Sequence, residues 1–193
     1  MDLTRGSEQD RRNRAKKMML LFAIISMVMM FAGLTSAYVV SKSRPDWLTQ
    51  FELPQSFLWS TIVIVVSSIT MFLAKKNIIA GNRTNGTAFL IGTLVLASVF
   101  VVFQFQGFAS IVEAGYYFTG SESTITTSFI YVLVLAHLAH LAGGLIVLLV
   151  LIYNHFKQRY YNGQTLGLEL GATFWHFLDL LWVYLFCFLY FFR

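Results

Sequence analysis

Charged residues, proline and cysteine are all scarce in this sequence. Only 12% of its 193 residues are Asp, Glu, Lys or Arg, and only two are proline, whereas 57% are hydrophobic. This balance excludes an ordinary soluble domain. The single cysteine, Cys187, excludes a disulfide within the chain. Because it lies in an apolar run, we expect it to be a small, unreactive core residue.

Long apolar runs are abundant instead. Five of them can each cross a hydrocarbon core of about 30 Å, and they cover residues 18–40, 55–74, 86–111, 127–153 and 172–192. Because lipid offers the backbone no hydrogen-bond partners, runs of this length span a membrane as α-helices. The predicted fold is therefore all-α. It is a multi-pass membrane protein in which residues 18–193 form one bundle of five transmembrane helices, with no separate soluble domain.

Basic residues lie mainly on one side of the predicted spans. Six precede the first span, within residues 1–17, and others follow the second and fourth spans: Lys75, Lys76, Arg83, Lys157 and Arg159. The positive-inside rule then predicts a cytoplasmic N-terminal segment, and the odd number of spans places Arg193 outside. Since these residues lie beside membrane entries, orientation and anionic lipid explain the net charge of +5 better than nucleic acid does.

Small residues predict close contacts between helices at two places. Gly33 and Ala37 lie four positions apart in the first span, and Gly143 and Gly144 interrupt the fourth. Small side chains at this spacing let helix backbones approach one another. We therefore expect neighbouring helices to meet the first and fourth spans at these positions.

Ionisable side chains within the fourth span are candidates for function, because they are costly to place in lipid. His137 and His140 share one helix face with Gly144. Two histidines could share a metal, but such a site needs further ligands, and His176 is the only other candidate within a span. Helix rise places His140 about 20 Å and His176 about 6 Å from the cytoplasmic side. We therefore predict no metal site and expect both histidines to bond a neighbouring helix or partner.

The last span carries an imidazole and a carboxylate. From Trp175 to Trp182 it reads W-H-F-x-D-x-x-W, so that His176 and Asp179 lie one turn apart on one helix face. The pair predicts an ion pair or a neutral hydrogen bond that fixes this helix against its neighbours. A proton relay is the alternative, since intramembrane carboxylates and imidazoles serve that purpose in pumps.

These motifs resemble subunit III of the haem-copper cytochrome oxidases, whose C-terminal helix carries the W-H-F-x-D pattern. Glu169 precedes Trp175 by six positions, as the family's glutamate does, and the stretch from His137 to Gly144 is similar to the family's H-G-L-H-x-x-x-G. Weaker similarities are Trp59-Ser60-Thr61, Ser67-Ser68-Ile69-Thr70 and Gln104. The five spans correspond to the last five of seven in longer members, so the resemblance is to a short bacterial form.

The resemblance implies a chain without haem or copper of its own, in a respiratory oxidase that reduces oxygen to water and translocates protons. Partner subunits hold the metal centres. Subunit III packs on subunit I, in a complex with subunit II and other small subunits, holds structural phospholipids, and supports assembly, proton uptake and sustained turnover. Lys157 and Arg159 resemble a basic loop near lipid phosphates. The resemblance implies a location in a bacterial plasma membrane. It is also compatible with a supercomplex that includes other respiratory complexes.

Two positions depart from the family pattern. After Ile24-Ile25-Ser26 the family commonly has a carbodiimide-reactive glutamate, whereas this chain has Met27. Near Gln104, Gly107 stands where another glutamate is usual. Neither residue can carry carboxylate chemistry, so what replaces these groups is open.

Other functions remain as alternatives. A quinol oxidase would use the same subunit, because subunit III does not bind the electron donor. A small transporter would need a path lined by polar groups or broken helices, and the third and fifth spans offer few. A membrane cytochrome would use His137, His140 or His176 as haem ligands.

Overall fold

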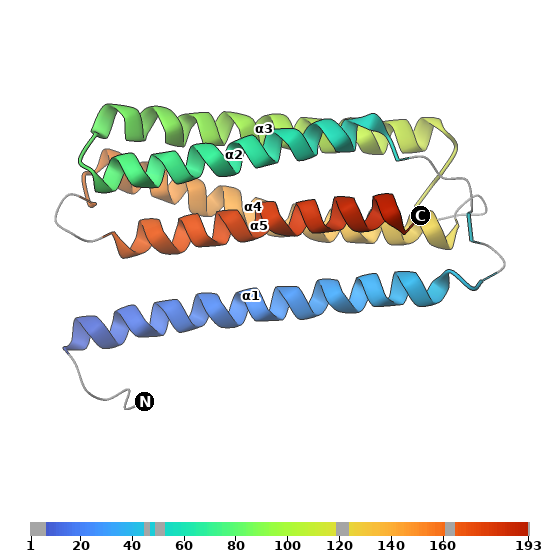
Figure 1. The fold of residues 1–193 in the computed structure, drawn as a ribbon, viewed down its shortest axis with the longest axis horizontal. Coiled ribbons are helices and arrows are strands. Elements are labelled where there is room, and N and C mark those ends of the chain that lie inside the picture. The colour runs from blue at the N-terminus through green and yellow to red at the C-terminus, as the bar shows by residue number, and fades with distance from the viewer. Residues whose placement is uncertain (1–6, 45–46, 49–52, 119–123, 161–164, 193) are drawn as a thin grey trace.

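The computed structural model describes residues 7–44, 47–48, 53–118, 124–160 and 165–192. Its five helices are α1 (Glu8–Ser41), α2 (Gln55–Ile79), α3 (Arg83–Glu113), α4 (Ile125–Phe156) and α5 (Leu166–Phe191). They run up and down alongside one another (Figure 1). Each is long and apolar enough to cross a membrane, which confirms the predicted all-helical, multi-pass fold. Arg193 and the first six residues lie outside the described part.

The helices extend beyond most of the predicted spans. α1 begins at Glu8 and continues through the basic segment that we expected to precede the first span. The Ser7 hydroxyl accepts from the Asp10 backbone N–H at 3.2 Å and caps this start. α5 begins at Leu166 and therefore includes Glu169. Hydropathy marks the lipid-facing length of a helix, whereas caps and backbone hydrogen bonds determine its ends, which explains the difference.

α2 and α3 form a tight antiparallel pair, joined by a short turn in which Gly81 has a φ of 81°. The register is shown by four pairs in contact: Phe57 with Gly107, Ser60 with Gln104, Thr70 with Thr93, and Ile78 with Gly86. α5 packs on α2 and α4, and α4 also packs on α3. Among the described helices, α1 contacts only α4 and α5 (Figure 1).

One end of the bundle carries most of the basic residues, and we call it the basic end. It holds the start of α1, the α2–α3 turn, the end of α4 and the start of α5 (Figure 1). Its basic side chains include Lys75, Lys76, Arg83, Lys157 and Arg159. The positive-inside rule would place this end in the cytoplasm, and that orientation stays a prediction.

Trp182 of α5 lies at the meeting point of four helices. Its ring lies 6.0 Å from Phe57 of α2, 5.2 Å from Phe100 of α3 and 5.1 Å from His137 of α4, measured between centroids. All four side chains are buried. Aromatic rings at these separations add to the packing energy of their buried area, so this cluster forms the centre of the core.

α1 is attached to the bundle along one narrow ridge. Its buried side chains are Met27, Phe31, Thr35 and Tyr38, about one per turn. The Thr35 hydroxyl hydrogen-bonds Tyr184 of α5 at 3.1 Å. The half of α1 before Met27 buries none of its described side chains, so the basic end of this helix stands apart from its neighbours.

The two predicted small-residue contacts have different outcomes. A Cβ added at Gly144 would lie 2.6 Å from Cδ1 of Leu178, so α5 does approach α4 closely there, as predicted. A Cβ at Gly33 would meet no described atom within 4 Å, and Ala37 is exposed. The contact predicted at Gly33 is therefore wrong, because the α1 ridge lies on another face of the helix.

Cys187 is exposed on α5 and is not a core residue, so that prediction is also wrong. An apolar run in a membrane helix has both an inner and a lipid-facing side, and composition alone does not tell them apart.

Gly107 and Gly92 provide a matched test of the α2–α3 packing. A Cβ at Gly107 would lie 2.8 Å from two atoms of the Phe57 ring, whereas one at Gly92 would meet nothing within 4 Å. Gly107→Ala should lower the free energy of unfolding by about 1–3 kcal/mol. Gly92→Ala should leave it unchanged or raise it by up to about 1 kcal/mol. Denaturation of the purified chain in detergent measures both values, and equal losses would contradict the packing described here.

Candidate functional site

Polar side chains line the contacts of α2 with α3 and α5, and we call this set the polar seam. Its members are Ser60, Thr61, Ser67 and Ser68 on α2, Gln104 on α3, and Trp175, His176, Asp179 and Trp182 on α5. The α2 residues form two adjacent pairs separated by seven positions, which is about two helical turns. Both pairs therefore face the same side of α2.

Hydroxyl groups fit within this apolar helix because they can bond the helix's own backbone. Ser60 and Thr61 both donate to the carbonyl oxygen of Phe57, at 2.8 and 2.7 Å. Each hydroxyl oxygen keeps a lone pair that can accept a second hydrogen bond. At Ser60 and Thr61 the α2 face thus offers acceptors to its neighbours while both hydroxyl protons are already paired.

The two tryptophans of α5 use these acceptors. Trp182 Nε1 donates to Thr61 Oγ1 at 3.0 Å, and Trp175 Nε1 donates to Ser67 Oγ at 3.3 Å. Both indoles are 1% exposed, so their N–H groups depend on partners within the protein. The spacing of the tryptophans matches that of the hydroxyl pairs, and α5 is therefore fixed to α2 at two levels.

His176 and Asp179 both lie beside Ser68, and no hydrogen bond joins them to each other. The Ser68 hydroxyl and His176 Nδ1 are 2.7 Å apart. Asp179 is 3% exposed, and the Ser68 hydroxyl is the polar group that acts on its carboxyl group. Neither carboxyl oxygen has a hydrogen bond of good geometry within the described residues. Sequence reasoning named His176 and Asp179 but missed the role of Ser68, which only the repeated Ser and Thr pairs of α2 could have suggested.

Gln104 is fully buried between α3 and α2. Its Nε2 donates to Ser60 Oγ at 2.9 Å, while its Oε1 finds no partner in the described part of the chain. One turn further on, the ring of Phe57 lies against Gly107. The space beside the position where the resemblance leads one to expect a glutamate is thus occupied by an aromatic ring. Met27, at the other departure, is buried on the α1 ridge.

His137 and His140 face different neighbours. His137 is fully buried between Phe100 and Trp182, and neither ring nitrogen has a partner among the described residues. His140 is half-buried, with Nδ1 at 2.7 Å from its own helix's Ala136 carbonyl oxygen and its ring beside α1. Neither ring bonds a neighbouring helix within the described chain, so a bond to a partner stays a prediction. In the same residues, no group of three or more His, Cys, Asp or Glu side chains could hold a metal ion.

An apolar groove with a cavity volume of about 490 Å³ lies between α1, α4 and α5 near the basic end. Leu20, Val150 and Phe174 contribute to its walls, and Asn154 lies at its polar margin. Arg159 donates to Asn154 Oδ1 at 3.3 Å. Burial raises the pKa of the neighbouring Tyr160 hydroxyl, with smaller opposing effects from Asn154 and Arg159.

Two further predicted residues lie near this end. Lys157 follows α4, and its ammonium lies 4.7 Å from the centre of the Tyr153 ring, a cation–π distance. Glu169 lies in the first turn of α5 and accepts a hydrogen bond from the Thr165 hydroxyl at 3.2 Å. A carboxylate near a helix N-terminus is also favoured by the helix dipole. Both effects stabilise the start of α5.

Ser60→Ala tests the buried bond to Gln104. The substitution removes the acceptor of Nε2 and leaves the whole amide unpaired, so we expect the free energy of unfolding to fall by about 1–3 kcal/mol. Adding Gln104→Leu should recover most of that loss, because both polar partners are then gone. Denaturation of the single and double variants measures the coupling, and strictly additive losses would contradict a direct interaction.

Comparison with known proteins gives a consistent result. The sequence matches the family described as "Cytochrome c oxidase subunit III" over residues 5–193. It is 27% identical to cytochrome c oxidase subunit 3 of Pelomedusa subrufa, over 93% of this chain and 70% of that protein. It is 31% identical to the Prototheca wickerhamii protein of that name, over 90% of this chain and 67% of that protein. It is 33% identical to the Pyricularia grisea protein of that name, over 75% of this chain and 50% of that protein.

The match covers nearly all of the chain and includes the polar seam on α2, α3 and α5. It agrees with the resemblance predicted from the W-H-F-x-D run and from the stretch between His137 and Gly144. The chain is a member of the cytochrome c oxidase subunit III family.

Proposed function

We propose that this chain serves as the non-redox subunit III of a respiratory haem-copper terminal oxidase. The family match over residues 5–193 is the observation that carries this proposal. In the proposed complex, subunit I and subunit II hold haem and copper, and oxygen reduction is coupled to proton translocation. This chain packs on subunit I and supports assembly, proton uptake and turnover. Cytochrome c and quinol are both compatible electron donors.

The polar seam supports a role in holding a fixed shape. Four described side chains of α5 turn toward α2, and two of them are fully buried tryptophans. A helix fixed in this way presents its outer face reproducibly to a partner. The bacterial plasma membrane and a respiratory supercomplex, both implied by the resemblance, stay predictions.

Purification from native membranes in mild detergent tests the proposed function. A tagged chain should copurify with a haem-containing complex that includes a large, histidine-rich membrane subunit. The same chain expressed alone should show no haem absorption. A colourless preparation containing only this chain, obtained under conditions that leave oxidase complexes intact, would contradict the proposal and favour a transporter.

Asp179 is proposed to fix α5, together with His176 and Ser68. Asp179→Ala truncates a buried side chain beside Ser68 and leaves a cavity where α5 meets α2, so the yield of assembled complex should fall about fivefold or more, equivalent to about 1 kcal/mol or more. Asp179→Asn keeps the shape and should assemble better. Yield is measured as haem per tagged chain. Normal assembly of Asp179→Ala with loss of proton translocation would instead favour the relay.

Structural phospholipid is proposed to occupy the groove between α1, α4 and α5. The apolar walls suit acyl chains, and Arg159, bonded at the groove margin to Asn154, suits a phosphate. Lys157, two residues before it, is the second candidate for a headgroup contact.

Arg159→Ala should therefore lower the amount of retained phospholipid about fivefold, because one basic side chain at an anionic headgroup contributes about 1 kcal/mol. Lys76→Ala removes the same charge from the C-terminal turn of α2, which does not border this groove, and serves as the control. Lipid analysis of the purified chain measures both. Equal retention in the two variants would contradict the proposed site.

A further inference from the structure

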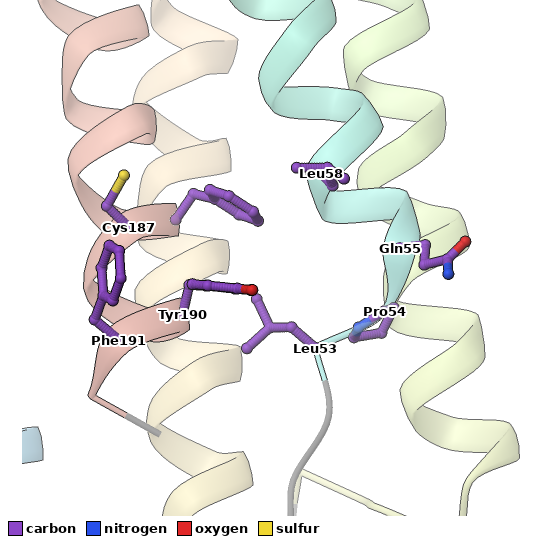
Figure 2. Close-up of a pocket in the computed structure, with 8 residues that line it drawn as sticks. Leu53, Pro54, Gln55, Leu58, Cys187, Tyr190 and Phe191 are labelled. Atoms are coloured by element: carbon purple, nitrogen blue, oxygen red, sulfur yellow. The ribbon is translucent and has the colours of Figure 1, made fainter.

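A second groove lies on the outside of the bundle between α2 and α5, away from the basic end. It is a pocket of about 340 Å³, whose walls include Leu58 at the start of α2 and Phe186, Cys187 and Tyr190 near the end of α5. Figure 2 shows Tyr190 reaching from α5 toward Leu53, across the space between the two helices. The pocket is open on one side and nearly all apolar.

The α2 side of this groove is an exposed ridge of large apolar side chains. The ridge consists of Leu58, Ile62, Val65, Ile69 and Phe72, all 43–58% exposed. Their spacing alternates between four and three residues, which is the spacing by which one helix packs along another. Within the described chain α2 has neighbours only on its other sides, α3 and α5.

Polar groups also lie between α2 and α5 nearer the basic end, beyond the pocket, and they distinguish a protein partner from lipid. Ser68 and His176 are half-buried, and Ser68 lies about 16 Å along α2 from its end at Ile79. That depth is within the hydrocarbon region, where lipid chains provide no hydrogen-bonding groups. A helix from another protein can provide them, whereas an acyl chain cannot.

The charged residues near Ser68 indicate which chemical group the partner helix carries. Lys75 is half-buried on the same face of α2 as Ser68, two turns nearer the basic end, and acts electrostatically on the His176 ring. Asp179 is the only acid of the polar seam, and it is buried beneath Ser68 and not open to the groove. The polar groups that stay partly exposed here therefore include a cation, Lys75, which suits a partner with an acceptor.

We infer that the face formed by this groove, the α2 ridge and Lys75 is the docking site for one transmembrane helix of a partner subunit, a helix with an apolar face and a carboxylate or other hydrogen-bond acceptor at the level of Lys75 and His176. The inference rests on the proposed function, because it requires that this chain work within a complex. It adds the face used for docking and the chemistry of the helix that occupies it.

Cys187 is a natural probe of this groove, because it is the only cysteine in the chain and borders the pocket. A membrane-permeant maleimide should label it in the isolated chain in lipid nanodiscs. In the purified complex it should react at least about tenfold more slowly, since a covered thiol is unreactive. The control is Cys187→Ser combined with Ser110→Cys, which moves the thiol to an exposed position near the end of α3, at a depth similar to that of Cys187 and outside the pocket. Its labelling should change little.

Lys75 and Lys76 provide a matched pair of substitutions that tests the role of the Lys75 charge. Lys75→Glu should reduce the recovered complex by about tenfold, because it places an acid against the partner's acceptor. Lys76→Glu alters the neighbouring exposed lysine and should have little effect. Equal losses in both variants would contradict a specific acceptor at Lys75.

The outcomes separate this inference from the proposed function. If the chain copurifies with the haem-containing complex but Cys187 reacts at the same rate in both states, the groove is not the docking site. If Cys187 is already protected in nanodiscs, an acyl chain fills the pocket and the partner helix is rejected. If no haem-containing complex copurifies, the proposed function itself fails.

Discussion

The arrangement of α2, α3 and α5 depends on hydrogen bonds between hydroxyl groups of α2 and nitrogen donors of α3 and α5. In lipid, hydrophobicity does not drive helices together, so close packing and interhelical hydrogen bonds have to hold them. Ser60, Thr61 and Ser67 each accept from a buried side chain of another helix. Because a buried N–H without a partner is costly, these bonds favour one register over its neighbours. The aromatic cluster around Trp182 then packs in that register.

Much of the fold could be predicted from the sequence, because five apolar runs without interruption leave little choice but five helices. It was harder to predict which side of each helix faces the bundle. Gly144 lies against α5 as expected, yet Gly33 and Cys187 face outward. In a soluble helix polarity separates the inner from the outer face, but in a membrane helix both are apolar. Small size or low polarity at one position therefore does not identify the core.

The sequence predicted which residues belong to the candidate site but not which side chains they contact. The W-H-F-x-D run identified His176 and Asp179 as unusual, and both do lie where α5 meets α2. Their pairing across one turn of a helix was the simplest prediction, since helix geometry alone gives it. Ser68 changes that arrangement because it comes from a helix more than a hundred residues earlier in the chain. Such contacts depend on the register between helices, which the spacing within one helix does not determine.

The single-ridge attachment of α1 has a consequence for the order in which the bundle forms. Among the described helices α1 comes before the others in this sequence, yet the two helices that it contacts, α4 and α5, come after α2 and α3. α2 and α3, by contrast, meet across a short turn and can pair as soon as both are inserted. α1 can therefore dock only after α4 and α5 have been inserted, beside an α2–α3 pair that has already formed.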